Sequence, residues 1–237
     1  MPKPFSFKQF TIEQDRCAMQ IGTDGVLLGA WTPLEKKPNS ILDIGTGTGL
    51  IALQMAQRSQ AETIDAIEVD ANAYEQCVEN FEASQWADRL FCYHAFFQEF
   101  VEEIDEQYHL IVANPPFYSE NVSSGNTARD ISRQNQSLPF SELLAGVSKL
   151  LSKEGLFSTI IPFKEEANFI AIAASFGLFP QRIMRVKGNP AAEIKRSLLA
   201  FSFTASSILE DELIIEVKRH QYTEAYIALT KDFYLKM

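Results

Sequence analysis

An asparagine, two prolines and an aromatic residue follow one another at Asn114, Pro115, Pro116 and Phe117. They come directly after the hydrophobic run 108–113, which is typical of a buried strand. Proline cannot continue a sheet ladder and fixes its own φ, so the chain should leave the sheet as a rigid turn that carries an amide side chain. On its own the stretch fits either an ordinary proline-rich loop or a functional site. The functional interpretation requires a further motif upstream.

Such a motif is the glycine-rich loop 43–49, which closes an earlier apolar strand. Glycines let a ligand approach the backbone closely, and the helix that follows exposes unpaired N–H groups. The spacing G-x-G-x-G differs from the G-x-G-x-x-G of dinucleotide binders, and the carboxylate of Asp43 would repel a pyrophosphate. The loop therefore suits an amino-bearing ligand. Its candidate ligand-binding residues are Asp43, Gly45, Thr46, Gly47 and Gly49.

Glu68 stands at the end of the next predicted strand, about twenty residues after the loop, where an acid can accept both hydroxyls of a ribose. Alternatively, Glu68 is an ordinary surface carboxylate, as the presence of a second acid nearby, Asp70, would suggest. A ribose without a pyrophosphate, joined to a positively charged amino acid, describes S-adenosylmethionine.

These residues need a scaffold, and hydrophobic periodicity supplies one. Strands and helices alternate from residue 40 onward at the spacing of right-handed βαβ units, which predicts an α/β fold with a mostly parallel sheet. Short strands near 5–12 and a helix from 24 to 31, capped by Thr23 or Asp24, come before them. The predicted strands are 40–44, 63–69, 90–93, 108–113, 156–161, 179–186 and 198–204, and the helices are 49–58, 71–83, 98–104, 140–151 and 164–175. Two polar gaps, 118–137 and 187–195, follow strands at the carboxyl side of the sheet.

Composition restricts the class of protein. The chain has 237 residues, with 46% hydrophobic and 22% charged, which fits one globular domain. It shows neither a membrane-spanning stretch nor a signal peptide. Three scattered cysteines argue against disulfides and zinc, and the three histidines are isolated. We therefore expect a cytoplasmic protein without a metal ion, and a monomer.

The net charge of −10 argues against a nucleic-acid partner if it is taken alone. Positive charge is nevertheless concentrated within 181–196, where five cations face only Glu193. Two more arginines lie in the polar loop after Asn114. The candidate RNA-binding residues are Arg129, Arg133, Arg182, Arg185, Lys187, Lys195 and Arg196.

Taken together, the chain resembles class I S-adenosylmethionine-dependent methyltransferases over nearly its whole length. The loop 43–49 matches their cofactor loop, Glu68 their ribose acid, and 114–117 the (D/N)-P-P-(Y/F/W) motif of enzymes that methylate amino groups conjugated to a π system. Within that class it is similar to the bacterial tRNA(Val) adenine-N6 methyltransferase family, which methylates the adenine beside the anticodon. The stretches 22–31, 128–129 and 231–235 carry that closer likeness. One departure is 94–97, where many relatives have a polar contact to the adenine of the cofactor.

The resemblance implies a Rossmann-like three-layer sandwich with a mostly parallel seven-stranded sheet and an antiparallel C-terminal edge strand. It implies one domain with an N-terminal extension (1–35), a core (36–205) and a C-terminal appendage (206–237). It further implies that the Asn114 side-chain oxygen and the Pro115 carbonyl accept the hydrogens of an adenine amine while Phe117 stacks on the base. Asp24 becomes a candidate contact to the methionine end of the cofactor, and Asn114 is a candidate cofactor contact as well as a catalytic residue.

Other functions remain open at this point. The same motif serves methylation of a protein glutamine at N5 and of a ribosomal RNA guanine at N2. The absence of a separate N-terminal helical domain argues against the glutamine enzyme. A non-catalytic cofactor-binding module would not need Asn114, and the glycine spacing does not suit an NAD-dependent oxidoreductase.

Overall fold

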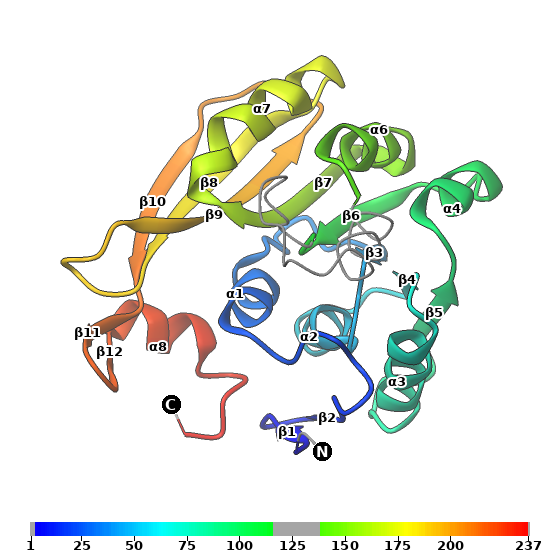
Figure 1. Ribbon diagram of the computed structural model, residues 1–237. Helices are drawn as coiled ribbons and strands as arrows, with labels where there is room; N and C mark the ends of the chain where they lie inside the picture. The colour runs from blue at the N-terminus through cyan, green and yellow to red at the C-terminus, as the bar shows by residue number, and fades with distance from the viewer. Residues whose placement is uncertain (1–2, 116–137, 237) are drawn as a thin grey trace, which may run out of the picture.

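The computed structural model describes residues 3–115 and 138–236, and its centre is an eight-stranded sheet (Figure 1). All neighbouring pairs in this sheet are parallel except β7–β9 and β8–β9. Across the sheet, the strands are β10 (Leu209–Ile214), β8 (Phe179–Lys187), β9 (Ile194–Ser202), β7 (Leu151–Pro162), β6 (Tyr108–Ala113), β3 (Ser40–Ile44), β4 (Thr63–Glu68) and β5 (Leu90–His94).

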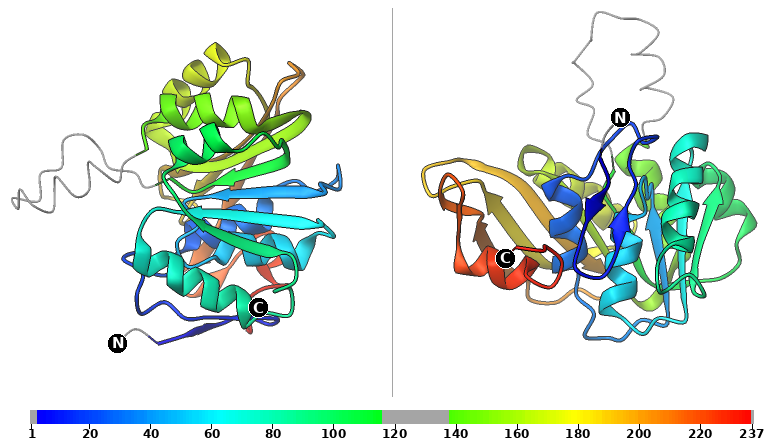
Figure 2. Two further views of the ribbon diagram at one scale, coloured as in Figure 1. Left: turned by 90° about the vertical axis from the view of Figure 1, so that its right-hand side faces the viewer. Right: turned by 90° about the horizontal axis from the view of Figure 1, so that it is seen from below.

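Helices cover both faces of the sheet and complete a three-layer sandwich (Figures 1 and 2). One face carries α1 (Thr23–Trp31), α2 (Leu50–Arg58), α3 (Ala71–Glu82) and α8 (Glu224–Thr230). The other carries α4 (Phe97–Glu103), α6 (Phe140–Leu150) and α7 (Glu166–Ser175), which follows the 3-10 turn η1 (Phe163–Glu165). The expected fold class is confirmed.

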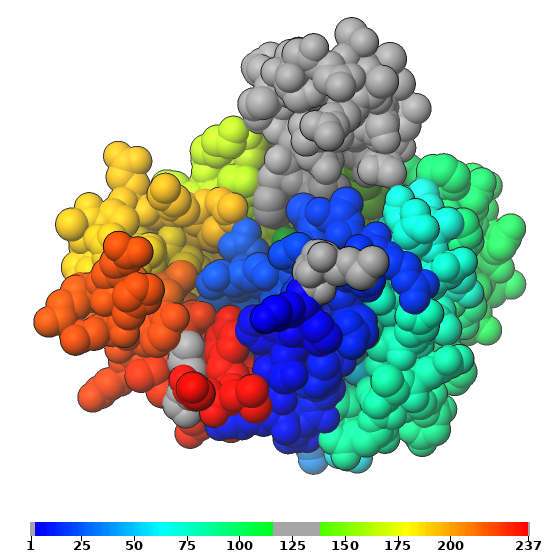
Figure 3. Space-filling model, turned by 60° about the horizontal axis from the view of Figure 1, so that its bottom comes forward, coloured from blue at the N-terminus to red at the C-terminus, as the bar shows by residue number. Residues whose placement is uncertain are grey.

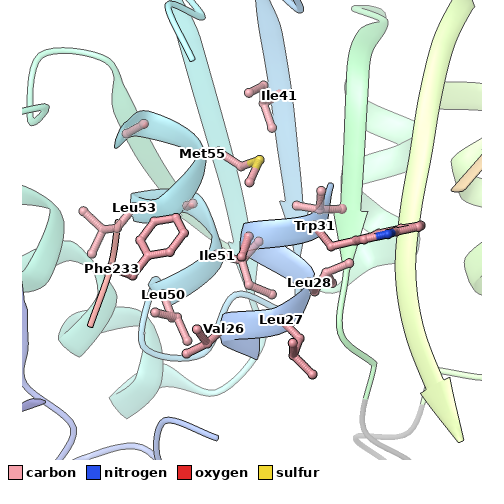
Figure 4. Close-up of a cluster of buried hydrophobic side chains, with 14 of the residues drawn as sticks. Val26, Leu27, Leu28, Trp31, Ile41, Leu50, Ile51, Leu53, Met55 and Phe233 are labelled. Atoms are coloured by element: carbon pink, nitrogen blue, oxygen red, sulfur yellow. The ribbon is translucent and has the colours of Figure 1, made fainter. Parts of the chain in front are cut away.

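The central strands are apolar on both faces because helices bury both. In β3, Ile41 packs into the core on the α1–α2 face, whereas Leu42 and Ile44 pack into the core beneath α4 and α6. Continuous apolar runs of this kind are characteristic of covered parallel sheets. Figure 4 shows the first core, in which side chains from α1 and α2 meet Phe233 near the C-terminus.

Two details of the predicted sheet are wrong. The sheet has eight strands, not seven, because β10 adds an edge strand parallel to β8. The antiparallel strand is β9, which lies inside the sheet between β8 and β7. β10 was missed because its sequence, Leu-Glu-Asp-Glu-Leu-Ile, carries three acids and is mostly exposed, so it lacks the hydrophobic signal of a strand.

Short strands at the two ends of the chain complete the fold. β1 (Phe5–Ser6) pairs with β2 (Thr11–Ile12), and Phe7 forms a bridge to Tyr234. β11 (Glu216–Lys218) and β12 (Gln221–Tyr222) form a hairpin that separates β10 from α8. The division at 35 and 205 stays a prediction, although β10 from the expected appendage belongs to the main sheet.

Across the described residues, none of the helices combines the length and apolar character that crossing a membrane requires.

Candidate functional site

A cavity of about 250 Å³ opens at the carboxyl ends of β3, β4, β5 and β6. The strand order reverses between β3 and β6, and in open α/β sheets ligands bind at such a reversal. The predicted residues Gly45, Gly47, Glu68, Asn114 and Pro115 all line this cavity. Three of the predicted segments, far apart in the sequence, therefore converge on one cavity.

The glycine loop adopts a conformation that few other residues could take. Gly45, Gly47 and Gly49 have φ angles of 69°, 57° and 84°, in the left-handed region that favours glycine. A Cβ at Gly45 or Gly47 would meet no atom within 4 Å, so these positions face open space. A Cβ at Gly49 would lie 2.6 Å from a ring carbon of Phe81, so this glycine is required for packing instead.

Asp43 lies beneath the loop and does not line the cavity. Its Oδ2 accepts hydrogen bonds from the Thr46 hydroxyl (2.6 Å) and the Ala52 amide (3.2 Å), while its Oδ1 has no partner. Complete burial raises the pKa of Asp43 to about 7, although these two hydrogen bonds lower it. The structure therefore places Asp43 and Thr46 as residues that shape the loop.

Glu68 joins the loop to the end of β4. One carboxylate oxygen accepts the Gly47 amide (2.8 Å), and the other accepts the amides of Val69 and Asp70 (both 2.9 Å). An ionised carboxylate offers about four acceptor positions, so capacity remains for ligand hydroxyls. Its side chain is held rigidly at the cavity wall, which is the arrangement that a ribose-binding acid needs.

The segment after β5 forms an apolar wall of the cavity. It overlaps 94–97, where the sequence lacks the polar contact to the cofactor adenine that many relatives have. Ala95, Phe96 and Phe97 line the cavity, whereas His94 points its Nε2 to the Val69 carbonyl (3.1 Å) and stacks on Tyr74. Phe96 is 51% exposed, which leaves its ring available to a flat ligand. His94 therefore has a structural role, and the aromatic side chain is the better candidate for contact with the cofactor adenine.

Asn114 is only partly buried, and its side chain forms no hydrogen bond within residues 3–115 and 138–236. Its Nδ2 lies 3.9 Å from where a Cβ on Gly25 would stand, so α1 approaches it closely. Pro115 is buried. A carboxamide without a partner at the edge of a cavity is available to a substrate. The other predicted residues of the motif, Pro116 and Phe117, lie outside the described residues, as do Arg129 and Arg133.

Sequence reasoning missed the segment that covers the cavity from the N-terminal side. Cys17, Ala18 and Met19 line it, and they belong to the stretch 13–21 between β2 and α1. Burial, reinforced by nearby acids, raises the pKa of the Cys17 thiol to about 11, so this thiol stays neutral. No periodicity or motif marks this stretch, and only its position before the glycine loop could have suggested it.

Asp24 does not line the cavity. It accepts a hydrogen bond from Arg196 Nε at 2.7 Å, in an ion pair that joins α1 to β9. It is not a helix cap either, because α1 begins after Gly22 without a side-chain cap. Its predicted contact with the cofactor stays a prediction.

The cations predicted to bind RNA lie on β8 and β9, and acids or rings engage most of them. Arg185 is paired with Glu166 (2.7 Å) and Glu210 (2.8 Å), which together with the Glu166 hydrogen bonds raise its pKa. Lys187 pairs with Glu212 (2.8 Å). Arg182 lies over the Trp31 ring at 5.4 Å, and Lys195 is exposed.

The described residues contain no cluster of three or more histidines, cysteines or acids that could hold a metal ion.

Comparison with known proteins gives a consistent result. Residues 22–139 match the family model described as "Methyltransferase small domain". A relative from Christiangramia forsetii is 60% identical over 99% of both chains, and its name is tRNA1(Val) (adenine(37)-N6)-methyltransferase. Proteins of the same name from Flavobacterium johnsoniae and Bacteroides fragilis are 58% and 45% identical, covering 98% and 100% of this chain and 100% of their own.

Solved structures agree on the fold. A structure described as a predicted O-methyltransferase of Agrobacterium tumefaciens superposes with a TM-score of 0.69 at 21% identity, covering 89% of this chain and 96% of its own. A putative RNA methyltransferase of Pyrococcus horikoshii gives 0.54 at 17% identity, covering 75% and 80%. At such identities the likeness shows a shared class I fold alone.

Proposed function

The chain belongs to the tRNA1(Val) (adenine(37)-N6)-methyltransferase family, and on this premise we propose which of its residues carry out the reaction. The protein is an S-adenosylmethionine-dependent methyltransferase that acts on the N6 amine of an adenine in tRNA. The catalytic assignment rests on one observation, the unpartnered carboxamide of Asn114 at the edge of the cavity.

The residues present fit S-adenosylmethionine. Gly45 and Gly47 face open space in the cavity, so a ligand can lie against their backbone where a side chain would intrude. Glu68 offers its remaining acceptor positions to ribose hydroxyls, and Phe96 offers an apolar face to the adenine. When bound, the cofactor supplies a methyl group on a sulfonium, which is activated for transfer.

The amine is the difficult partner, because the lone pair of N6 is delocalised into the adenine ring. We assign to the Asn114 Oδ1 and the Pro115 carbonyl the role of accepting its two hydrogens. These contacts favour a pyramidal nitrogen whose lone pair points at the methyl group. The proline after Asn114 restricts the backbone, so the acceptors need little reorganisation in the transition state. Pro116 and Phe117 complete the proposal, with Phe117 stacking on the extruded base.

The test is Asn114→Ala. Loss of one preorganised acceptor should lower kcat for tRNA methylation by about 10² to 10³. Affinity for S-adenosylmethionine, measured by calorimetry, should change less than about threefold, because Glu68 and the glycine loop carry that contact. Asn168→Ala, at an exposed asparagine on α7, is the matched control and should leave both quantities unchanged.

Nucleoside analysis of the product completes this experiment. N6-methyladenosine in tRNA is the expected product of the wild-type protein. A labelled methyl group found in a guanosine or in a protein glutamine would show that the substrate is not a tRNA adenine. An equal loss of turnover and cofactor affinity in Asn114→Ala would refute the catalytic assignment alone.

We propose further that the protein is a cytoplasmic monomer organised as a single domain with a core at 36–205. Its free cysteines and its tRNA substrate support the proposed cytoplasmic location. The RNA contacts predicted from the sequence stay predictions for Arg129, Arg133, Arg182, Arg185, Lys187, Lys195 and Arg196, and the ion pairs of Arg185, Lys187 and Arg196 make these three the weaker candidates.

A further inference from the structure

An acidic protein that binds tRNA must offer cations that its own acids do not neutralise. Most cations on β8 and β9 fail this criterion, because Arg185, Lys187 and Arg196 are each in an ion pair. The surface that meets phosphates must therefore include other residues. Among the exposed cations of the described residues that form no ion pair, Lys195, Lys218 and Arg219 belong to the β8–β9 loop region and the β11–β12 hairpin beside it.

Lys218 and Arg219 lie at the turn of the β11–β12 hairpin. Lys218 pairs with Gln221, so Arg219 and His220 form a two-residue turn, and His220 has a φ of 63°. All six residues from 217 to 222 are exposed. The hairpin thus presents two positive side chains to solvent at a tight turn.

The hairpin is fixed to the body of the protein at its base. The amides of Ile215 and Glu216 donate to the carbonyls of Lys187 and Gly188, at 2.9 and 3.0 Å. These bonds place the hairpin beside the loop between β8 and β9, and Figure 3 shows the two segments on one face of the molecule. The turn is therefore held in a defined position and is not a loose connection.

The start of β9, in the region next to this hairpin, is joined to α1, and α1 approaches Asn114 at the cavity. Lys195 is next to Arg196, which pairs with Asp24 of α1. The residue after Asp24 is Gly25, which faces the Asn114 side chain. In addition, β8 and β10 are parallel to each other and run in the same direction as β6, so their carboxyl ends lie on the same side of the sheet as the site.

We propose that Lys195, Lys218 and Arg219 form a docking surface for the phosphate backbone of tRNA, which holds the body of the substrate while one adenine enters the cavity. The proposal rests on the proposed function for the identity of the polymer. Among the nearby acids, Glu212 is paired with Lys187 and Glu216 accepts the His220 amide, whereas Asp211 and Glu224 are exposed and reduce the positive field of the hairpin. Glu193 is the exposed acid of the neighbouring loop, and it limits the positive field without cancelling it.

The experiment compares two double variants. Lys218→Ala with Arg219→Ala removes both hairpin cations. Lys149→Ala with Lys153→Ala removes two exposed cations near the start of β7, at the opposite side of the sheet, and is the matched control. Binding of unmodified tRNA transcript is measured by fluorescence anisotropy between about 50 and 200 mM salt, the range over which phosphate contacts change affinity strongly.

Loss of two phosphate contacts should weaken binding about tenfold and reduce the slope of log K against log salt by about 1.5. Because the hairpin does not touch the cavity, kcat at saturating tRNA and affinity for S-adenosylmethionine should stay at wild-type values. Melting curves of both double variants should match the wild type, since all four side chains are exposed.

Equal tRNA affinity and salt slope in the hairpin variant and its control would overturn the proposal, even if the wild type methylates adenine. Failure of the proposed function would be seen in a different measurement, the nucleoside analysis, as the absence of N6-methyladenosine after reaction with the wild-type protein. A wild type that binds tRNA with no salt dependence would also count against the docking surface.

Discussion

Two carboxylates near the glycine loop, Glu68 and Asp43, differ in burial, and this difference separates their roles. Glu68 is engaged by three backbone amides and lies at the cavity wall, where it is the proposed contact to the ribose. Asp43 is completely buried, has one unpartnered oxygen and reaches only Thr46 and Ala52. An acid with so little compensation favours its neutral form, which explains its raised pKa.

This difference predicts a pH dependence for Asp43. The pKa of its carboxyl is about 7 in the folded protein, against 3.8 for an unperturbed aspartate. Folding thus retains a proton that the unfolded chain has released, so this group destabilises the fold as pH rises from about 4 to 7. Between pH 5.5 and 8 the wild type should lose about 2 kcal/mol of unfolding free energy relative to Asp43→Asn.

Urea unfolding at several pH values measures this difference. Asp88→Asn, at an exposed position, is the control and should follow the wild-type profile. Parallel profiles for the wild type and Asp43→Asn would show that Asp43 is ionised throughout this range.

The sequence carried enough information for the residues that chemistry constrains most. The glycine spacing and the acid after the next strand located Gly47 and Glu68 in the cavity, because backbone geometry permits few alternatives there. Asp43 lies at the end of β3 beneath the loop and outside the cavity lining, a position that depends on which face of β3 is covered. The partners of Arg185 and Asp24 are 25 and 172 positions away, at Glu210 and Arg196, and no local pattern reveals such pairs.

At the level of elements, one buried side chain connects the covering segment to the cofactor loop. Asn80 of α3 exchanges hydrogen bonds with the backbone of Glu13, accepting at 2.9 Å and donating at 2.9 Å. It also donates to the Thr48 carbonyl at 2.9 Å. Gln76, one turn earlier, accepts the Arg16 amide. Side chains of α3 therefore hold the stretch 13–21 by hydrogen bonds to its backbone, which has no strand partner among the described residues.

Asn80→Ala should loosen this attachment. Three hydrogen bonds are lost and buried backbone groups are left without partners, which should cost about 2 to 4 kcal/mol. Affinity for S-adenosylmethionine should fall as well, because the covering segment and the glycine loop lose their common support. Hydrogen exchange of 13–21 should become faster. Asn72→Ala, at an exposed position on the same helix, serves as the control, and unchanged exchange in Asn80→Ala would contradict the role of this asparagine.

Strong periodicity made most core elements predictable, and weak periodicity explains the exceptions. The strands from β3 to β7 carry long apolar runs, so their existence and order followed from the sequence. β10 and the hairpin after it are short and polar, because they lie at the edge of the sheet with water on at least one side. β10 pairs with β8, which is distant in the sequence, whereas β11 and β12 pair with each other in a separate small sheet.

On the scale of the whole molecule, the two ends of the chain close against each other. Phe233 is 1% exposed and packs into the core with α2, as Figure 4 shows. Its carbonyl accepts the Lys8 amide at 2.8 Å, and the neighbouring Asp232 carbonyl accepts Gln57 of α2 at 2.9 Å. The C-terminal segment is thus part of the layer that supports the cofactor loop.

Phe233→Ala should therefore destabilise the entire protein. Removing a buried phenylalanine side chain typically costs about 3 to 5 kcal/mol. Unfolding should stay a single transition, because this residue belongs to the main core. Leu235→Ala, which removes a side chain that is 58% exposed, is the control and should change stability by less than about 0.5 kcal/mol. Chemical denaturation of both variants checks this, and similar midpoints would show that the C-terminal segment is dispensable for stability.

The ion pairs between β8 and β10 have a consequence for turnover. Arg185 and Lys187 lie on a strand next to the proposed docking surface, and each is held in an ion pair with an acid of β10, Glu210 or Glu212. A modifying enzyme must release each tRNA after one methyl transfer, and every additional phosphate contact would prolong the lifetime of the product complex. On the proposed docking surface, cations that are held in ion pairs would add little to tRNA affinity, so the acidic edge strand would favour dissociation of the methylated product.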